Sequence, residues 1–145
     1  AARLASRSSL PTYEPVDAQD GLSARPMVAG LFFPVITMTE PAAHAHSKRE
    51  LLGADASPAR VARYSAERDL PADMPPTLVA HAADDPVVSP ANSLMMFTAL
   101  QAAKIPSELH IFETGKHGLP LREAGRDHPW PSLFERFAHN HGLSA

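Results

Sequence analysis

The sequence predicts an α/β fold with about three parallel strands and flanking helices, and three observations lead to this prediction. Two short apolar runs, Met27–Phe33 and Leu78–Ala80, are bounded by prolines or charged residues, as expected for strands buried on both faces. A third strand is predicted at Ser107–Phe112, where apolar and polar residues alternate. Helical patterns separate these runs, and strands that alternate with helices are typical of a parallel sheet.

The predicted helices begin and end at recognisable residues. Ser57 followed by Pro58 combines an N-cap with a proline at the first helical position, so a helix is predicted from there to about Glu67. Ala91 to about Lys104 reads as an amphipathic helix. The segment Trp130–Gly142 is predicted as a closing helix that turns aromatic side chains toward the sheet and ends at a glycine.

Length, charge and cysteine content exclude several classes of protein. The chain has 145 residues, which suits one domain, and its formal net charge of −3 gives no sign of nucleic-acid binding. It contains no cysteine, so neither a disulfide framework nor thiol catalysis is possible. No segment approaches the roughly 20 consecutive apolar residues of a transmembrane helix.

Two adjacent carboxylates, Asp84 and Asp85, come just after the strand predicted at Leu78–Ala80. In open parallel sheets, functional side chains lie just beyond the carboxyl ends of the strands. Asp85 is explained more simply as a residue that caps the following turn or helix. Asp84 is therefore the candidate for a functional acid.

A histidine follows the third predicted strand, in the segment Gly115-Lys-His117-Gly118. Successive parallel strands joined by a crossover usually lie side by side, so Asp84 and His117 are expected to leave neighbouring strand ends. A lone histidine in such a loop is more often an ordinary polar residue. An acid followed by a histidine at adjacent strand ends is, however, the acid–histidine half of a catalytic triad.

Four stretches of the sequence form a recognisable series: Leu31-Phe-Phe-Pro-Val-Ile36, Leu51-Leu-Gly53, Ala80-His-Ala-Ala-Asp-Asp85 and Phe112-Glu-Thr-Gly-Lys-His-Gly118. Together they resemble the C-terminal half of an α/β-hydrolase, and the branch they resemble most is that of bacterial acetyl-esterase and lipase proteins, often grouped with xylan and feruloyl esterases. The resemblance implies that the three strands are the sixth to eighth of the family. It also implies hydrolysis of carboxylic esters through a serine ester intermediate.

The resemblance implies roles for two residues. His117 would be the general base, and Asp84 would orient its imidazole, because the family's acid directly precedes a second aspartate and lies three residues before a valine. The sequence departs from the family pattern at Ser89, where relatives often have a proline directly after the two valines. Asp85 therefore stays open as the acid.

The family's nucleophile elbow, Gly-x-Ser-x-Gly, does not occur in the 145 residues. The opening Ala1–Ser6 resembles the helix that follows the elbow, and Ser6, Ser8 and Ser9 lack the strained turn that would expose a nucleophile. Residues 1–145 are thus expected to be a single incomplete α/β-hydrolase domain, with the elbow and the oxyanion donors upstream of residue 1. Alone, the chain is expected to be inactive and to self-associate through the exposed strand 27–33.

The segment from Thr37 to Gly53 is expected to form a lid-like insertion, with a short helix after Pro41. Phe33 and Met38 are candidate walls of a substrate pocket, with plain loop packing as the alternative. His44 and His46 could supply at most two metal ligands and no carboxylate cluster accompanies them, so neither a metal nor a cofactor is predicted.

A small-molecule or carbohydrate ester is the expected substrate, with no nucleic-acid partner and no membrane span. Two other functions stay open at this point. One is a serine peptidase of the prolyl-oligopeptidase type, which shares the Asp-Asp-x-Val-Val and Gly-x-His-Gly patterns more loosely. The other is a non-catalytic α/β module used for binding. The sequence upstream of residue 1 would discriminate among these functions.

Overall fold

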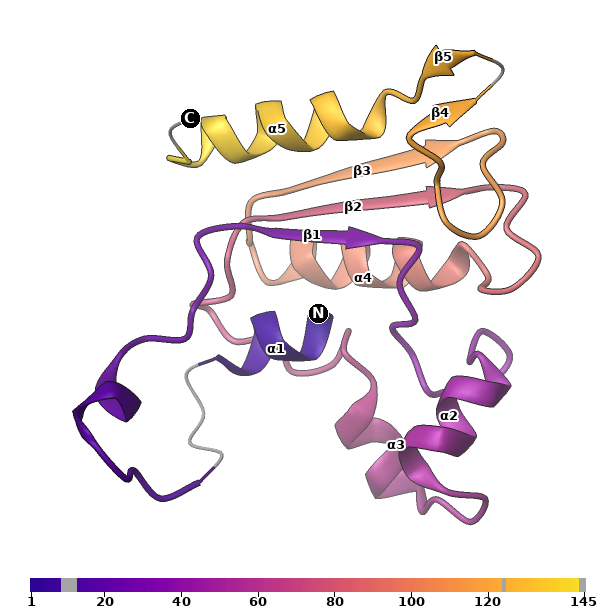
Figure 1. The fold of residues 1–145 in the computed structure, drawn as a ribbon. Helices are drawn as coiled ribbons and strands as arrows, with labels where there is room; N and C mark the ends of the chain where they lie inside the picture. The colour runs from indigo at the N-terminus through magenta and orange to yellow at the C-terminus, as the bar shows by residue number, and fades with distance from the viewer. Residues whose placement is uncertain (9–12, 124, 144–145) are drawn as a thin grey trace.

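The computed structural model describes residues 1–8, 13–123 and 125–143, and its centre is a parallel three-stranded sheet (Figure 1). The strands are β1 (Ala29–Phe32), β2 (Thr77–Ala82) and β3 (Ser107–Phe112), and they lie in that order. β2 is the middle strand, and all six of its residues are buried. The predicted α/β sheet of three parallel strands is confirmed.

Proline residues mark where the strand pairing begins. The N–H of Ala29 donates to the carbonyl of Pro76 at 2.9 Å, and the N–H of Thr77 donates to the carbonyl of Pro106 at 3.0 Å. Proline has no N–H of its own, so it cannot extend the ladder to a further neighbour. β1 accordingly starts at Ala29, two residues after the predicted start at Met27.

Helices cover both faces of the sheet (Figure 1). On one face lie α4 (Ala91–Ala102) and α1 (Ala2–Arg7), and on the other lies α5 (Trp130–Asn140). The first face has a core in which Leu31, Val79, Met96 and Leu100 are buried. The second core includes Leu78, Ala80, Ala82 and Phe137, with Phe32, Phe134 and Trp130 packed against it.

Gly30 is required by the close approach of α5 to β1. A Cβ atom at this position would lie 2.8 Å from ring atoms of both Phe134 and Phe32. Those two rings meet edge to face with their centroids 5.6 Å apart, a favourable aromatic geometry. The absence of a side chain at Gly30 therefore allows the aromatic face of α5 to rest on the sheet, as the sequence pattern of this helix predicted.

The remaining elements are short. Two helices, α2 (Ala45–Leu52) and α3 (Pro58–Tyr64), follow β1, and a 3₁₀ helix, η1 (Ala18–Gly21), precedes it. A small antiparallel pair, β4 (Arg122–Glu123) and β5 (Arg126–Asp127), lies between β3 and α5. Ser9, one of the serines considered as a nucleophile, falls outside the described residues, which omit residues 9–12. Within the described residues, every helix is too short or too polar to traverse a lipid bilayer.

The predicted start of α3 is confirmed, but its end is not. The Ser57 hydroxyl accepts a hydrogen bond from the N–H of Arg60 at 3.3 Å, as an N-cap should. The helix stops at Tyr64 and not near Glu67. It stops because Ser65 adopts an extended conformation and its hydroxyl accepts the N–H of Met38 at 3.0 Å. The tie to the loop after β1 replaces the last helical turn.

Asn92, at the start of α4, fastens the segment that follows β1. Its side-chain oxygen accepts the N–H groups of Ile36 and Thr37 at 2.9 and 3.0 Å, and its amide donates to the carbonyl of Ala42 at 2.9 Å. The side chain is fully buried. Residues 36–42 have no sheet partner, so these bonds supply hydrogen-bond partners to backbone groups that would otherwise lack them.

We expect Asn92→Ala to lower the free energy of unfolding by roughly 3–5 kcal/mol, because it leaves several buried backbone groups without partners at about 1–3 kcal/mol each. Denaturant unfolding followed by circular dichroism measures this change. Asn140→Ala, at an exposed position of α5, is the matched control and should change stability little. Equal midpoints for the two variants would contradict the role given to Asn92.

Candidate active site

The site is built around the carboxylate of Asp85, in the turn that follows β2. Its Oδ1 accepts the N–H groups of Val87 at 2.8 Å and Val88 at 2.9 Å. Its Oδ2 accepts from Nδ1 of His117 at 2.9 Å and from Nε2 of His81 at 3.1 Å. The side chain has no solvent exposure. Four N–H donors thus hold one buried carboxylate in a single orientation.

Burial of the Asp85 carboxyl would by itself raise its pKa. The N–H of Val88, the His117 imidazole and the N–H of Val87 act in the opposite direction and hold the pKa below its ordinary value. Asp85 is therefore ionised at neutral pH. An ionised carboxylate can only accept hydrogen bonds, which places a proton on Nδ1 of His117.

His117 stands in a tight loop after β3. Gly115 and Gly118 have φ angles of +150° and +132°, and Lys116 between them has φ +52°, so the loop winds through conformations that glycine adopts easily. The His117 side chain is 35% exposed. Because Nδ1 is bound to Asp85, Nε2 is the nitrogen left to accept a proton from a reacting group.

The prediction that Asp84 meets the imidazole is wrong, because Asp85 occupies that place. The N–H of Asp85 reaches back to the carbonyl of Ala82 at 3.3 Å and closes a turn, which leaves Asp84 exposed. Asp84 instead accepts the N–H of Lys116 at 2.9 Å and ties the two loops together. The turn-capping role predicted for Asp85 is also present, so one carboxylate both caps the turn and holds the histidine.

The two residues predicted as pocket walls lie in different places. The ring of Phe33 packs edge-on against that of His117, with centroids 4.9 Å apart. Met38 is buried and lines a separate hollow with Lys48, Val61 and Arg68, which contains neither Asp85 nor His117. Phe33 is next to the pair and Met38 is not, and contact of either with a substrate stays a prediction.

Two residues of this site, His81 and Ser93, were not predicted. His81 lies inside β2 and Ser93 inside α4, and both are fully buried. Nδ1 of His81 lies 2.7 Å from the hydroxyl of Ser93, and Nε2 lies near both Asp85 and the carbonyl of Val88. A histidine within an otherwise apolar strand was the available signal, because a buried polar side chain requires partners.

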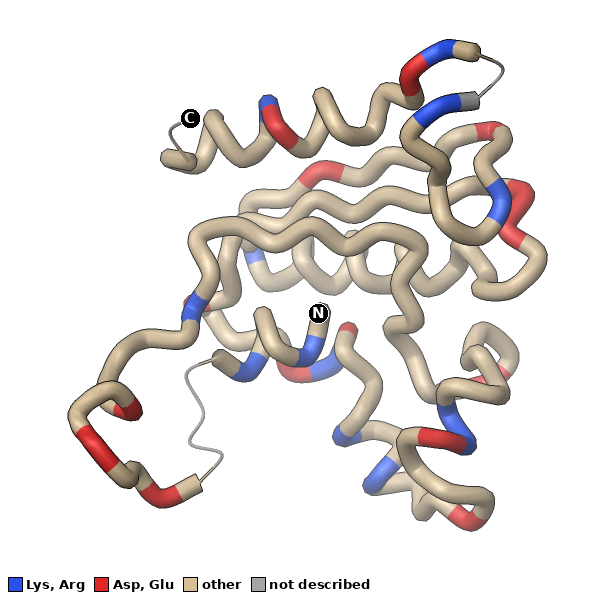
Figure 2. The backbone as a smooth tube through the Cα atoms, in the orientation of Figure 1, with Lys and Arg blue, Asp and Glu red and all other residues tan. Residues whose placement is uncertain are grey.

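Asp85 and His117 follow the carboxyl ends of β2 and β3. Charged segments gather in the loops at this edge of the sheet (Figure 2). A hollow of about 460 Å³ opens beside Asp85, with walls from Pro41, His44, Val87 and Pro90. It lies between the acid turn and the start of α2. The insertion predicted at 37–53, which includes α2, therefore forms one wall of a hollow next to Asp85.

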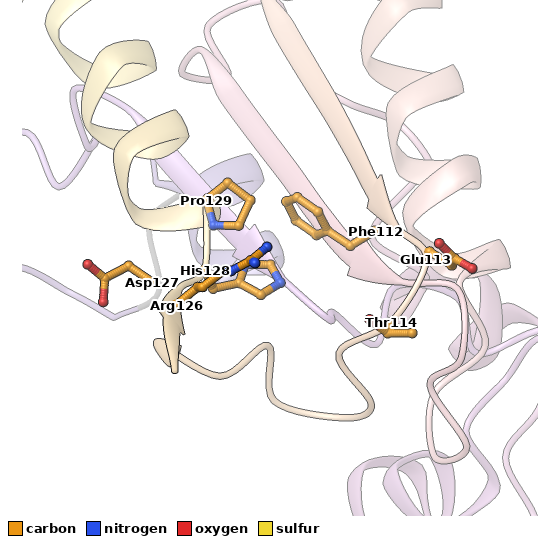
Figure 3. A pocket seen from close by; sticks show the side chains of 7 residues that line it. All are labelled: Phe112, Glu113, Thr114, Arg126, Asp127, His128 and Pro129. Carbon is orange, nitrogen blue, oxygen red and sulfur yellow. The ribbon is translucent and has the colours of Figure 1, made fainter. Parts of the chain in front are cut away.

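A second hollow lies beyond the end of β3 (Figure 3). Its lining includes Phe112, Glu113, Arg126 and His128, and it contains neither Asp85 nor His117. The rings of Phe112 and His128 meet edge to face with centroids 4.5 Å apart. This pocket is thus distinct from the acid–histidine pair.

His44 and His46 do not form a larger ligand set. Nδ1 of His44 contacts the hydroxyl of Ser47 at 2.9 Å, and Nδ1 of His46 lies 3.2 Å from the Arg49 guanidinium. In the part of the chain that the structure describes, no three acidic, histidine or cysteine side chains come together in a set that could hold a metal ion.

A parallel sheet with an acid–histidine pair at the carboxyl ends of adjacent strands is the arrangement expected in the C-terminal half of an α/β-hydrolase. Comparison with protein families narrows this class. The chain belongs to the prolyl oligopeptidase family, whose model matches residues 35–140.

The relatives of this chain carry names of carbohydrate-active enzymes and esterases. It is 37% identical over 100 residues to endo-1,4-beta-xylanase B of Butyrivibrio fibrisolvens, and the matched region covers 69% of this chain and 16% of that protein. It is 32% identical over 100 residues to acetylxylan esterase of Xylanibacter ruminicola, and the matched region covers 65% of this chain and 20% of that protein.

Solved structures agree with this relationship. The acetyl ester-xyloside bifunctional hydrolase from Caldicellulosiruptor lactoaceticus is 32% identical with a TM-score of 0.88, over all of this chain and 53% of that one. A carboxylesterase from Lactobacillus plantarum is 29% identical with a TM-score of 0.63, over 82% of this chain and 46% of that one. The chain thus spans about half the length of these structures. The predicted resemblance to bacterial esterases is confirmed.

Proposed function

We propose that this chain is the C-terminal part of a serine hydrolase that cleaves carboxylic esters, with acetylated or feruloylated carbohydrate as the substrate class. The observation that carries the proposal is the bond from Nδ1 of His117 to the buried carboxylate of Asp85. A carboxylate in this position fixes the tautomer of the imidazole and stabilises the imidazolium that forms during acyl transfer.

In the proposed reaction, Nε2 of His117 takes the proton of a serine hydroxyl as the serine attacks the ester carbonyl. His117 then returns that proton to the leaving alcohol, and a water molecule releases the acyl group by the same route. The sequence has no Gly-x-Ser-x-Gly elbow, and the chain covers 53% of the esterase structure it resembles. We therefore assign the serine and the oxyanion donors to residues outside this chain.

The names of the relatives favour esters over peptides as substrates. The family model takes its name from a peptidase, but the relatives at 28–37% identity include an acetylxylan esterase, an acetyl ester-xyloside hydrolase and carboxylesterases. Peptidase activity is kept as an outcome of the test. A non-catalytic module has less support, because a buried carboxylate shared by four N–H donors is a costly arrangement unless a charge is needed there.

The test uses the full-length protein encoded by the gene, compared with residues 1–145 alone. We expect the full-length protein to release acetate from acetylated xylooligosaccharides and to react with a fluorophosphonate probe at a serine. Residues 1–145 should do neither, since no elbow serine is available to His117. Cleavage of proline-containing peptides without ester turnover would replace the proposal with a peptidase. Absence of both activities and of probe labelling would reject it.

The same comparison addresses self-association. β1 is an outer strand of the described sheet, so its free edge can pair with another chain. We propose that residues 1–145 alone form dimers or larger species through residues 27–33. A monomer in light scattering would reject this part without bearing on the esterase assignment.

A further inference from the structure

His81 is the most unusual residue of the middle strand. All six residues of β2 are buried, and His81 is the one titratable residue among them. A titratable side chain in such a place requires an explanation. Its ring has no solvent exposure and both of its nitrogens have partners. It touches the same oxygen, Oδ2 of Asp85, that accepts the His117 hydrogen bond.

The partners determine where the proton of His81 lies. Nε2 faces two acceptors, the carbonyl of Val88 at 3.0 Å and Oδ2 of Asp85 at 3.1 Å. Neither acceptor can donate, so Nε2 carries the hydrogen. In this tautomer Nδ1 is an acceptor, and the hydroxyl of Ser93, 2.7 Å away, can donate to it. The two acceptors at Nε2 thus select the tautomer, and the Ser93 hydroxyl supplies a partner to Nδ1 in that tautomer.

We propose that His81 is a positioning residue for His117, acting through Asp85, and that Ser93 supports it by supplying a hydrogen-bond partner to Nδ1 of His81. The two backbone N–H groups of Val87 and Val88 hold Oδ1 of the carboxylate. His81 holds the plane of the carboxylate from the Oδ2 side. With both oxygens fixed, Oδ2 faces Nδ1 of His117 at 2.9 Å.

The arrangement joins one helical layer, that of α4, to the carboxyl edge of the sheet. Ser93 lies in α4, His81 in β2 and His117 in the loop after β3. A loop residue held only by its own backbone would move with the loop. Here the orientation of an imidazole in an exposed loop is set by the buried core. The proposal concerns this geometry, and only its kinetic consequence rests on the proposed function.

Two substitutions at His81 separate positioning from simple packing. His81→Gln can place a donor nitrogen near the position of Nε2, so it can still bind Asp85. His81→Asn is shorter, and its amide reaches toward Ser93 but not toward Asp85. Both introduce a neutral amide at the same buried place. If His81 positions His117, the His81→Gln protein should keep the orientation of His117 better than the His81→Asn protein.

The direct readout is nitrogen-15 NMR of labelled histidines in the full-length protein, which needs no substrate. We expect His81 to carry its proton on Nε2 and His117 to carry its proton on Nδ1 with a low-field resonance. His81→Asn should lose or broaden the His117 resonance, and His81→Gln should keep it. A His81 protonated on Nδ1 would overturn the proposal, whether or not the protein hydrolyses esters.

The kinetic readout is the split between kcat and KM for an aryl acetate. His81→Asn should lower kcat by about 10- to 100-fold, by analogy with the loss when a hydrogen-bond partner that orients a metal-binding side chain is removed, with little change in KM. His81→Gln should recover most of kcat. His110→Asn is the matched control, because His110 is also a strand histidine bound to a carboxylate, that of Glu108 at 3.1 Å.

Ser93→Ala tests the proposal if His81→Asn does not fold. Loss of the hydroxyl leaves Nδ1 of His81 without a partner in the core, so we expect the His81 ring to be held less firmly and kcat to fall less than in His81→Asn. A wild-type His117 resonance and wild-type kcat in Ser93→Ala would overturn the role given to Ser93. Equal effects of His81→Asn and His81→Gln on the resonance would reduce His81 to a packing residue. If no variant or wild-type protein hydrolyses esters, only the NMR result decides.

Discussion

Asp85→Asn in the full-length protein should lower kcat for short-chain aryl esters by up to about 10⁴-fold, the loss found when a triad acid becomes an amide. The carboxylate accepts four N–H groups through its two oxygens. An amide has only one oxygen, so its NH₂ group must face N–H donors on one side. The imidazole of His117 then loses its acceptor or turns to the other tautomer. Steady-state kinetics with an aryl acetate measures the effect.

Asp84→Asn is the matched control for this experiment. Its side chain is exposed, and an amide oxygen can still accept the N–H of Lys116. We expect kcat to change by less than about threefold, because the bond to Lys116 can be kept and the acceptor of the His117 imidazole is Asp85. If Asp84→Asn were the more damaging variant, the acid would be Asp84, as the sequence motif implied, and the geometry of the turn would have to change during the reaction.

His117→Ala in the full-length protein should reduce turnover of the same esters by about 10³-fold or more, because no other base remains to activate the serine. The imidazole is about a third exposed and packs on Phe33, so its loss should cost little stability. Kinetics and a thermal unfolding curve measure the two quantities separately.

His110→Ala controls for the loss of a histidine elsewhere on β3. His110 stacks on Phe112 and binds Glu108, and it has no contact with Asp85. It should keep ester turnover near that of the wild type. A His117→Ala protein that retained a tenth of wild-type turnover, at wild-type stability, would rule out His117 as the base.

The parallel sheet could be predicted because its signals are local. Apolar runs bounded by prolines predict buried strands, and the serine–proline pair predicts the start of α3. The end of α3 could not be predicted, because it depends on the bond between Ser65 and the backbone of Met38. That bond joins two segments that are distant in the sequence.

The sequence placed an acid beside His117 and missed the identity of that acid by one residue. Periodicity places the acidic turn at the end of β2 but does not say which of two adjacent carboxylates points inward. That choice is made by backbone N–H groups, those of Val87 and Val88, which only Asp85 can reach from its place in the turn. His81 was missed because its partner Ser93 lies on the next helix and its other partner is the unexpected acid.

The prolines that open β2 and β3 have a further consequence, for the way in which this chain can vary. Pairing starts at Pro76 and Pro106, and the residues counted from those points decide where Asp85 and His117 leave the sheet. A residue inserted before either proline lengthens a loop at the far end of the sheet and leaves the acid–histidine pair in place. A residue inserted after the proline shifts every later side chain to the opposite face and separates the pair. Length changes should therefore be tolerated ahead of these prolines and excluded between them and the site.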